Sequence, residues 1–248
     1  PELSSRRAPV RRAAMKAVIC AGPSTAGKTT VLRQAARRLI KAGMKPAYLK
    51  IDVQYASEDI IFASEFGIPA KKVFSGELCP DHCNVMVFSD AVAWAQECGA
   101  SVLMLETAGL CLRCSPYVEG ALGIAVLEAT AGMNLPMKIG PMLTLADAAV
   151  ITKIDLISQA EREVFRAGVM KAAPGIPVFE SNALYGIGID AVAARITAAP
   201  DIQGIDFKMR GSPPVGTCTV CVGRKETGWQ KHFGVVRPLD NGIFYRGE

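Results

Sequence analysis

Residues 22–30 read GPSTAGKTT, a run of small residues that ends in glycine, lysine and two threonines. The run fits the pattern GxxxxGK[ST], with an apolar segment at 17–21 before it and a helix-like apolar period at 29–42 after it. In such a strand–loop–helix context, small residues let successive backbone N–H groups wrap around phosphates, and the helix N-terminus attracts their negative charge. The stretch therefore predicts a phosphate-binding loop.

The residue types in this loop suggest which group each of them contacts. The ammonium of Lys28 is expected to contact the β- and γ-phosphates, and the hydroxyl of Thr29 is expected to bind Mg²⁺. The predicted nucleotide contacts in the loop are Gly22, Ser24, Ala26, Gly27, Lys28, Thr29 and Thr30.

Two acidic residues, Asp52 and Glu106, each end a predicted strand. Because the carboxyl ends of parallel strands meet at one edge of a sheet, these carboxylates are expected near the phosphates, where they hold Mg²⁺ or orient the attacking water. Gly109, just beyond Glu106, is expected to bring its backbone to the γ-phosphate. We predict a Mg²⁺ site at Thr29, Asp52 and Glu106, and catalytic roles for Lys28, Asp52 and Glu106.

A second loop points to guanine as the base. Residues 152–155, TKID, follow a predicted strand and fit the pattern [NT]KxD. An aspartate carboxylate can accept two N–H bonds from the guanine edge, whereas adenine has no such donor pair, and a lysine stem can cover the base plane. Residues 180–183, ESNA, loosely match the loop that GTPases place against the base. The predicted guanine contacts are Lys153, Asp155, Asn182 and Ala183.

Six of the eight cysteines lie in three close groups. Thiolate and imidazole ligands suit Zn²⁺, Ni²⁺ or Cu(I). Three ligands from one short loop rarely complete a site, but a two-fold dimer brings two such loops together. We predict the metal ligands to be Cys79, His82 and Cys83; a buried cysteine pair with a capping histidine is the structural alternative. The second candidates are two CxxC pairs, Cys111 with Cys114 and Cys218 with Cys221; Cys20 and Cys98 are expected in the core.

Composition and hydrophobic pattern predict the fold class. Half of the 248 residues are hydrophobic, which excludes wholesale disorder, and no apolar stretch approaches the roughly 20 residues that span a bilayer. The net charge of +5 is modest, so we expect no nucleic-acid partner. Strand-like and helix-like runs alternate, which predicts a three-layer α/β P-loop fold with a mostly parallel sheet and a small strand-rich C-terminal appendage.

We expect three segments along the chain. Residues 1–14 hold four arginines and no apolar period, and are expected to be a disordered tail or a non-native remnant. Residues 15–200 are expected to form the nucleotide domain, and residues 201–248 the cysteine-containing appendage. Since no signal-peptide-like or membrane-inserting segment is visible, we expect a cytoplasmic protein, whose cysteines serve metal or redox chemistry rather than disulfides.

Taken in order, these segments resemble the urease and hydrogenase nickel-insertion GTPases of the signal-recognition/MinD class of P-loop proteins. The segments that carry the resemblance are GPSTAGKTT (22–30), DVQYASED (52–59), LCPDH (78–82), LETAG (105–109) and the long stretch 126–156. The chain departs from the family pattern where Asp81 separates Pro80 from His82, where Cys83 is added, and where Thr152 replaces asparagine.

The resemblance implies a metallochaperone with slow intrinsic GTP hydrolysis. GTP and Mg²⁺ would order a homodimer and create a metal site across its two-fold axis from Cys79, His82 and Cys83. Hydrolysis to GDP would release the cargo, Ni²⁺ first and Zn²⁺ second, to a client apo-metalloenzyme or to other maturation proteins.

Three other functions stay open on sequence alone. A small-molecule kinase could use the same phosphate loop, and a preference for ATP with an organic acceptor would favour it. An iron–sulfur or redox protein could use the CxxC pairs, and charge-transfer bands in the visible spectrum would favour it. A related GTPase chaperone for cobalamin enzymes is also similar around the phosphate loop, but it gives no reason for CPDHC at 79–83.

Overall fold

Seven parallel strands form one sheet in the computed structural model, in the order β3-β2-β4-β1-β5-β6-β7. The structure describes residues 14–53, 55–75, 80–109, 115–202, 204, 206–211 and 225–228. The strands are β1 (Lys16–Ala21), β2 (Pro46–Asp52), β3 (Ala70–Phe74), β4 (Val102–Thr107), β5 (Leu122–Glu128), β6 (Ala148–Thr152) and β7 (Val178–Glu180).

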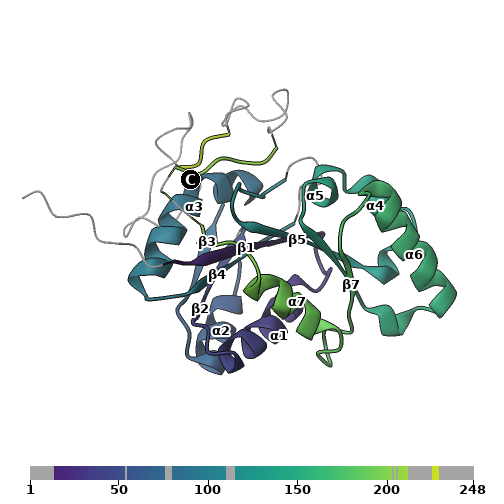
Figure 1. Ribbon diagram of the computed structural model, residues 1–248, viewed down its shortest axis with the longest axis horizontal. Coiled ribbons are helices and arrows are strands. Elements are labelled where there is room, and N and C mark those ends of the chain that lie inside the picture. The colour runs from purple at the N-terminus through teal and green to yellow at the C-terminus, as the bar shows by residue number, and fades with distance from the viewer. Residues whose placement is uncertain are drawn as a thin grey trace, which may run out of the picture.

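Helices cover both faces of this sheet (Figure 1). One layer consists of α1 (Lys28–Lys41), α2 (Glu58–Phe66) and α7 (Ile189–Thr197). The opposite layer consists of α3 (Pro80–Glu97), α4 (Leu135–Lys138), α5 (Pro141–Thr144) and α6 (Gln159–Ala172). The short 3₁₀ helices η1 (Ala129–Ala131) and η2 (Ile154–Leu156) follow β5 and β6. The predicted three-layer α/β fold with a parallel sheet is confirmed.

The run of residues in β1 is apolar because helices cover both faces of the sheet at this strand. Val18 and Cys20 pack with the α1 and α7 layer, whereas Ala17 and Ile19 pack with the α3 layer. All four side chains are buried. Since every strand is parallel, the loops after β1, β4, β5, β6 and β7 emerge at one edge of the sheet, where the predicted nucleotide residues lie.

The structure differs from the sequence-based expectation at β3, β4 and α3, among other elements. The structure adds β3, an edge strand with the sequence AKKVF. Its two lysines are typical of edge strands, where charged side chains oppose pairing with another chain. Strand β4 runs on to Thr107, so that Glu106 lies inside the strand rather than after it. Helix α3 begins at Pro80, so that residues 80–83 of the expected metal-binding loop form its first turn, and the side-chain amide of Asn84 donates to the Pro116 carbonyl at 2.6 Å.

Part of the predicted C-terminal appendage packs onto the main domain. The ring of Phe207 meets Phe88 of α3 edge-on at 5.1 Å, and Met209 pairs with Val118 in an isolated bridge. Arg210 donates to Asp147 at 2.6 Å and to the Leu145 carbonyl at 3.0 Å. The division near residue 200 and the tail at residues 1–14 stay predictions.

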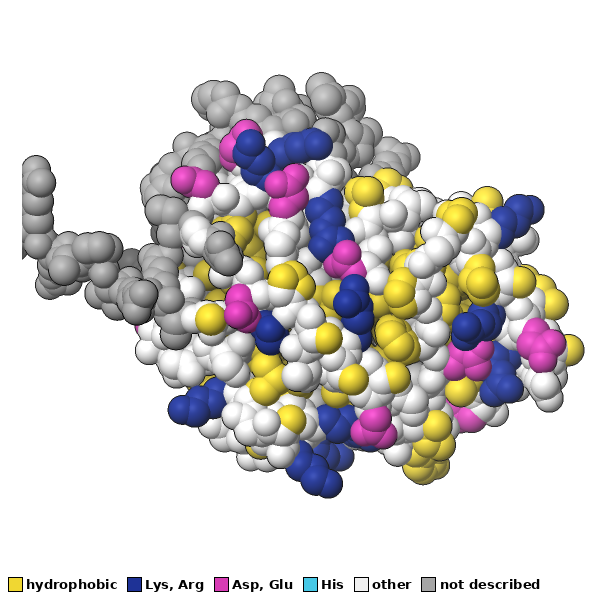
Figure 2. Space-filling view, viewed as in Figure 1, with side chains coloured by type: hydrophobic (Ala, Val, Ile, Leu, Met, Phe, Trp, Pro, Cys, Tyr) yellow, Lys and Arg dark blue, Asp and Glu magenta, His cyan; other side chains and the backbone are white. Residues whose placement is uncertain are grey.

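The described surface mixes charges of both signs. Figure 2 shows acidic and basic side chains next to one another over much of this face, with hydrophobic side chains between them. In the described ranges, no helix combines the length and apolar character needed to cross a bilayer. The expectation that nucleic acid is not a partner stays a prediction.

Candidate functional site

The loop between β1 and α1 combines residues of positive φ with a glycine that has no room for a side chain. Thr25 and Gly27 both lie in the left-handed region, with φ of 64° and 88°, which turns successive N–H groups toward one side. A Cβ on Gly22 would lie 2.1 Å from the Val126 carbonyl oxygen. A Cβ on Gly109 would lie 1.7 Å from the Gly22 carbonyl oxygen, so the predicted γ-phosphate residue Gly109 packs directly against this loop.

Lys28 is buried at the centre of this loop with 5% of its surface exposed. Its Nζ donates to the carbonyl oxygens of Gly22 at 2.9 Å and Pro23 at 2.8 Å. Burial lowers the pKa of Lys28, and the nearby carboxylate of Glu106 opposes part of that shift. The ammonium is thus poised where an anion would relieve its desolvation, as the phosphate-binding prediction requires.

Glu106 is the hub of the predicted Mg²⁺ side. It is 1% exposed and accepts from Thr29 Oγ1 at 2.8 Å, Tyr48 Oη at 2.8 Å and Lys50 Nζ at 2.6 Å. Asp52 lies next to this group, with its Oδ2 3.7 Å from Lys50 Nζ. Carboxylate and hydroxyl oxygens are ligands that suit Mg²⁺, so Thr29, Asp52 and Glu106 fit this ion.

Sequence reasoning missed Tyr48 and Lys50. Burial and the neighbouring Glu106 carboxylate raise the pKa of Tyr48 well above its usual value, so it is a neutral donor at physiological pH. Burial opposes the charge of Lys50, but Glu106 and the other nearby carboxylates outweigh it and raise its pKa. The available signal was a single lysine inside the otherwise uncharged, mostly apolar segment 46–51.

A cavity of about 310 Å³ joins the phosphate loop to the predicted base-binding loops. Its volume is at the lower end of the range for ligand sites. Thr152 Oγ1 donates to the Ala26 carbonyl at 2.7 Å, which fixes one loop against the other. The cavity is lined by Gly27, Thr30, Thr152, Lys153, Asp155, Leu156, Asn182, Ala183 and Leu184.

The structure therefore places the four predicted guanine contacts around one cavity. Lys153 has a left-handed backbone with φ of 58°, and its ammonium pairs with Glu128 at the end of β5. Asp155 is exposed to solvent. Leu156 and Leu184, which are 65% and 72% exposed, are apolar lining residues that sequence reasoning missed.

Most of the predicted metal ligands lie outside the described residues: Cys79, the side chain of His82, and the pairs Cys111 with Cys114 and Cys218 with Cys221. Cys83 is described, and its side chain is fully buried in the core cluster shared by α3, β2 and β4. In the described part of the chain, no group of three His, Cys, Asp or Glu residues could hold a metal ion. The metal site stays a prediction, and Cys83 could join it only if the start of α3 moved.

The two cysteines expected in the core behave differently. Cys20 in β1 is fully buried, and this burial raises the pKa of its thiol far above the usual range. Cys98, just after α3, is exposed, so the expectation for it was wrong. The helix ends one residue earlier, and Cys98 lies in the turn that leads to Gly99.

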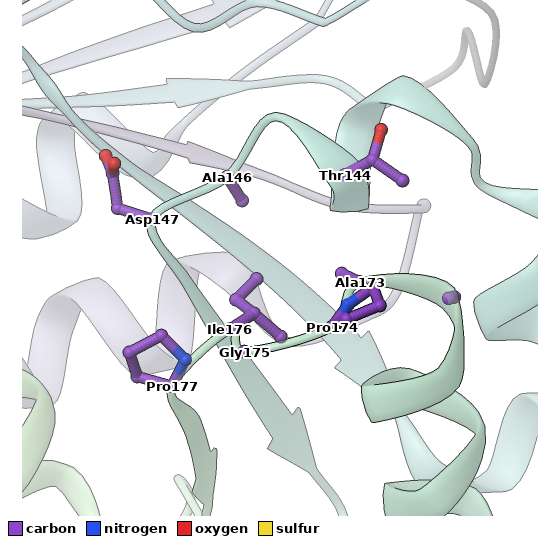
Figure 3. A pocket seen from close by; sticks show the side chains of 9 residues that line it. Thr144, Ala146, Asp147, Ala173, Pro174, Gly175, Ile176 and Pro177 are labelled. Atoms are coloured by element: carbon purple, nitrogen blue, oxygen red, sulfur yellow. The ribbon is translucent and has the colours of Figure 1, made fainter.

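A second cavity, of about 370 Å³, lies at the opposite edge of the sheet, before β6 and β7 (Figure 3). Two loops line it, one from Thr144 to Asp147 and one from Ala172 to Pro177. Its carboxylate, Asp147, already accepts from the Gly123 backbone N–H at 2.7 Å and from Arg210. The remaining lining residues are mostly alanine, proline and glycine, which offer no catalytic group.

Known proteins match this chain in sequence and in fold. An uncharacterized protein of Methanocaldococcus jannaschii is 43% identical over 235 residues, which cover 94% of this chain and 100% of that protein. Urease accessory protein UreG 2 of Streptomyces griseus is 27% identical over 193 residues, covering 69% of this chain and 82% of its own length. HypB from Helicobacter pylori, solved in complex with nickel, aligns with a TM-score of 0.61 at 19% identity, covering 77% of this chain and 92% of that chain.

A family model described as "CobW/HypB/UreG, nucleotide-binding domain" matches residues 16–180. The matched segment contains the phosphate loop, the Glu106 hub and the TKID loop, and it extends over more than half of the chain. It confirms the resemblance that the sequence motifs indicated. The chain therefore belongs to the CobW/HypB/UreG nucleotide-binding domain family.

Proposed function

We propose that this protein is a GTP-hydrolysing metallochaperone that loads a metal, nickel first and zinc second, into a client metalloenzyme. The observation that carries the proposal is the single cavity that joins Gly27 and Thr30 of the phosphate loop to Lys153 and Asp155 of the TKID loop. A P-loop protein that phosphorylates a small molecule has no need of a carboxylate that reads guanine. The family assignment supports the same function class.

The residues of the site divide the chemistry of hydrolysis among them. Lys28 and the loop N–H groups would bind the phosphates, while Thr29 and Glu106 would hold Mg²⁺, which neutralises phosphate charge when bound. Asp52, whose side chain is 28% exposed, would complete the Mg²⁺ site with them or orient the attacking water. Hydrolysis breaks the bond between the γ-phosphorus and the bridging oxygen and yields GDP and phosphate.

The chaperone cycle requires that metal affinity depend on the bound nucleotide. In the proposed cycle, GTP orders a homodimer whose two-fold axis brings together Cys79 and His82 from both copies, and hydrolysis loosens this site. The CxxC pairs at 111–114 and 218–221 remain second candidates for the ligands. A coupling of about 2.7 kcal/mol gives a hundredfold difference in metal affinity.

The experiment measures Ni²⁺ uptake by the wild type and by single cysteine variants, each with a non-hydrolysable GTP analogue and with GDP. Cys79→Ala should abolish the nucleotide-dependent part of Ni²⁺ uptake while GDP affinity stays unchanged. Cys98→Ala is the matched control, because Cys98 is exposed and lies at the other end of α3. Cys83→Ala decides whether the buried thiol takes part.

Two results would overturn the proposal. Tighter binding of ATP than of GTP would remove the guanine assignment, and with it the GTPase. Equal Ni²⁺ uptake with the analogue and with GDP in the wild type would remove the chaperone cycle. Loss of uptake in the CxxC variants, with Cys79→Ala unaffected, would refute the assignment of the cargo to residues 79–83.

A further inference from the structure

Lys50 is a buried cation among three carboxylates. Its Nζ lies 2.6 Å from Glu106 Oε1, 3.3 Å from Glu58 Oε1 and 3.7 Å from Asp52 Oδ2. These carboxylates come from three elements: β4, the first turn of α2, and the end of β2. Without a cation between them these like charges would repel one another.

Lys50 shares its main partner with a predicted Mg²⁺ ligand. Glu106 Oε1 accepts from Lys50 and also from Thr29 Oγ1 at 2.8 Å, so the ammonium and the hydroxyl meet on one oxygen. A divalent ion bound to Thr29 would therefore arrive beside an ammonium that already occupies its carboxylate. Two cations competing for one oxygen weaken each other's binding.

The same group of side chains connects Glu106 to α2. Lys50 pairs with Glu58 in the first turn of that helix. Tyr48, which donates to Glu106, stacks its ring on Phe62 of α2 with centroids 3.7 Å apart and planes 6° from parallel. Any change in what Glu106 binds therefore acts on two successive turns of α2.

We propose that Lys50 is a positioning residue that takes the place of Mg²⁺ among Glu106, Asp52 and Glu58 in the nucleotide-free protein, and that Mg²⁺ binds in competition with it. This inference rests on the proposed nucleotide function. When Mg²⁺ takes Glu106, the ammonium remains paired with Glu58 and Asp52, and the contact that joins Glu106 to the first turn of α2 is lost. Lys50 thus sets the Mg²⁺ concentration at which the site fills. Because Lys50 also contacts α2, the loss of its bond to Glu106 transmits Mg²⁺ binding to that helix.

The test measures the affinity for a fluorescent GDP analogue across a Mg²⁺ titration at constant ionic strength. Lys50→Met should lower the Mg²⁺ concentration for half-maximal effect about tenfold, in the usual range of coupling between contacting groups. Lys50→Arg, which keeps the charge, should retain the wild-type requirement. Lys72→Met is the matched control, because Lys72 on the neighbouring strand pairs with Asp59 of α2 and has no bond to Glu106 among its described contacts.

A second pair of variants gives an effect of opposite sign and keeps the test valid if Lys50→Met does not fold. Glu58→Gln leaves Lys50 to Glu106 and Asp52 and should raise the Mg²⁺ requirement several-fold. Asp59→Asn removes the same charge one residue away, where it pairs with Lys72, and should have a clearly smaller effect.

The proposal is overturned if Lys50→Met needs as much Mg²⁺ as the wild type, or if Lys72→Met shifts the requirement equally. If Lys50→Met does not fold, the test rests on Glu58→Gln. A Mg²⁺ requirement of Glu58→Gln that equals that of the wild type, or that of Asp59→Asn, then overturns the proposal. A role limited to stability would lower the unfolding midpoint without moving the Mg²⁺ titration. Failure of the wild type to bind the GDP analogue in a Mg²⁺-dependent way would instead refute the proposed nucleotide function.

Discussion

At the residue scale, Lys28 has a buried ammonium that donates to the carbonyl oxygens of Gly22 and Pro23 in the loop and, at 3.5 Å, to that of Ala108. Lys28→Ala should weaken GDP binding about a hundredfold, because charged hydrogen bonds to phosphate are each worth about 1.5–3 kcal/mol. The folded protein should lose little stability, since the variant also removes a buried charge. Titration calorimetry measures the affinity, with Lys41→Ala at the exposed end of the same helix as the control. Unchanged affinity for GDP would show that the phosphates bind elsewhere.

Asp155 tests the choice of base. Guanine presents two N–H donors on the edge where xanthine has a carbonyl, and an asparagine amide can donate to that carbonyl. Asp155→Asn should therefore weaken GDP binding by at least about tenfold and strengthen xanthosine diphosphate binding. Competition between the two nucleotides measures the ratio, and Asp190→Asn, at an exposed carboxylate outside the cavity, is the control. A ratio that stays at its wild-type value contradicts the role of the TKID loop.

The sequence predicted these contacts because their motifs are local. Residues 22–30 and 152–155 each combine a fixed spacing with a strand before it, so the side chains could be assigned without a structure. Lys50 and Tyr48 could not be assigned in this way, because their partner Glu106 lies more than fifty residues further along the chain. Only the parallel pairing of β2 with β4 brings them together.

At the element scale, two loops approach so closely that glycine is required. Gly109→Ala should displace the phosphate loop and abolish nucleotide binding, because the new Cβ would lie 1.7 Å from the Gly22 carbonyl oxygen. Gly99→Ala is the matched control, since Gly99 has a similar φ of 69° but open space around it. It should cost about 1–2 kcal/mol of folding free energy and leave binding intact. Equal nucleotide affinities for both variants would contradict the packing of these loops.

Helix α6 begins with a capping box between Ser158 and Glu161. The Ser158 backbone N–H and hydroxyl both donate to Glu161 and lower its pKa below the ordinary value of 4.5. A carboxyl group whose pKa is lowered in the folded protein stabilises the fold at pH values above its ordinary pKa. This stabilisation is lost as the pH falls through the pKa of the folded state. Ser158→Ala should lower the free energy of unfolding by about 1 kcal/mol at neutral pH. The difference in unfolding free energy between this variant and the wild type should become smaller at acid pH.

Urea unfolding at a series of pH values measures this effect. Ser57→Ala is the control, because Ser57 precedes α2 without a side-chain capping bond and should cost little. If Ser158→Ala lowers the free energy of unfolding by the same amount at neutral and at acid pH, the role of Glu161 is excluded.

Elements with a strong apolar period were predicted closely, and β3 was not. Helix α1, Lys28–Lys41, lies within one residue of the apolar period predicted at 29–42, because buried side chains recur along one face of it and Gly43 follows its end. Strand β3 has two lysines among five residues and exists because β2 offers it a free edge. Tertiary context of that kind has no local signal.

At the scale of the whole molecule, one edge of the sheet collects every predicted nucleotide residue. The carboxyl ends of β1, β2, β4, β6 and β7, with the segments that follow them, supply the phosphate, Mg²⁺ and base contacts (Figure 1). Residues 80 and 109 border the cysteine-containing segments 76–79 and 110–114, which lie outside the described residues. The chaperone account requires that the nucleotide at this edge control those segments.

The most direct measurement is Ni²⁺ affinity together with molecular mass for the nucleotide-free, GDP-bound and GTP-analogue-bound protein. We expect the analogue-bound form to be a dimer that binds Ni²⁺ about a hundredfold more tightly than the GDP-bound form. The same mass and the same Ni²⁺ affinity in all three states would contradict the account.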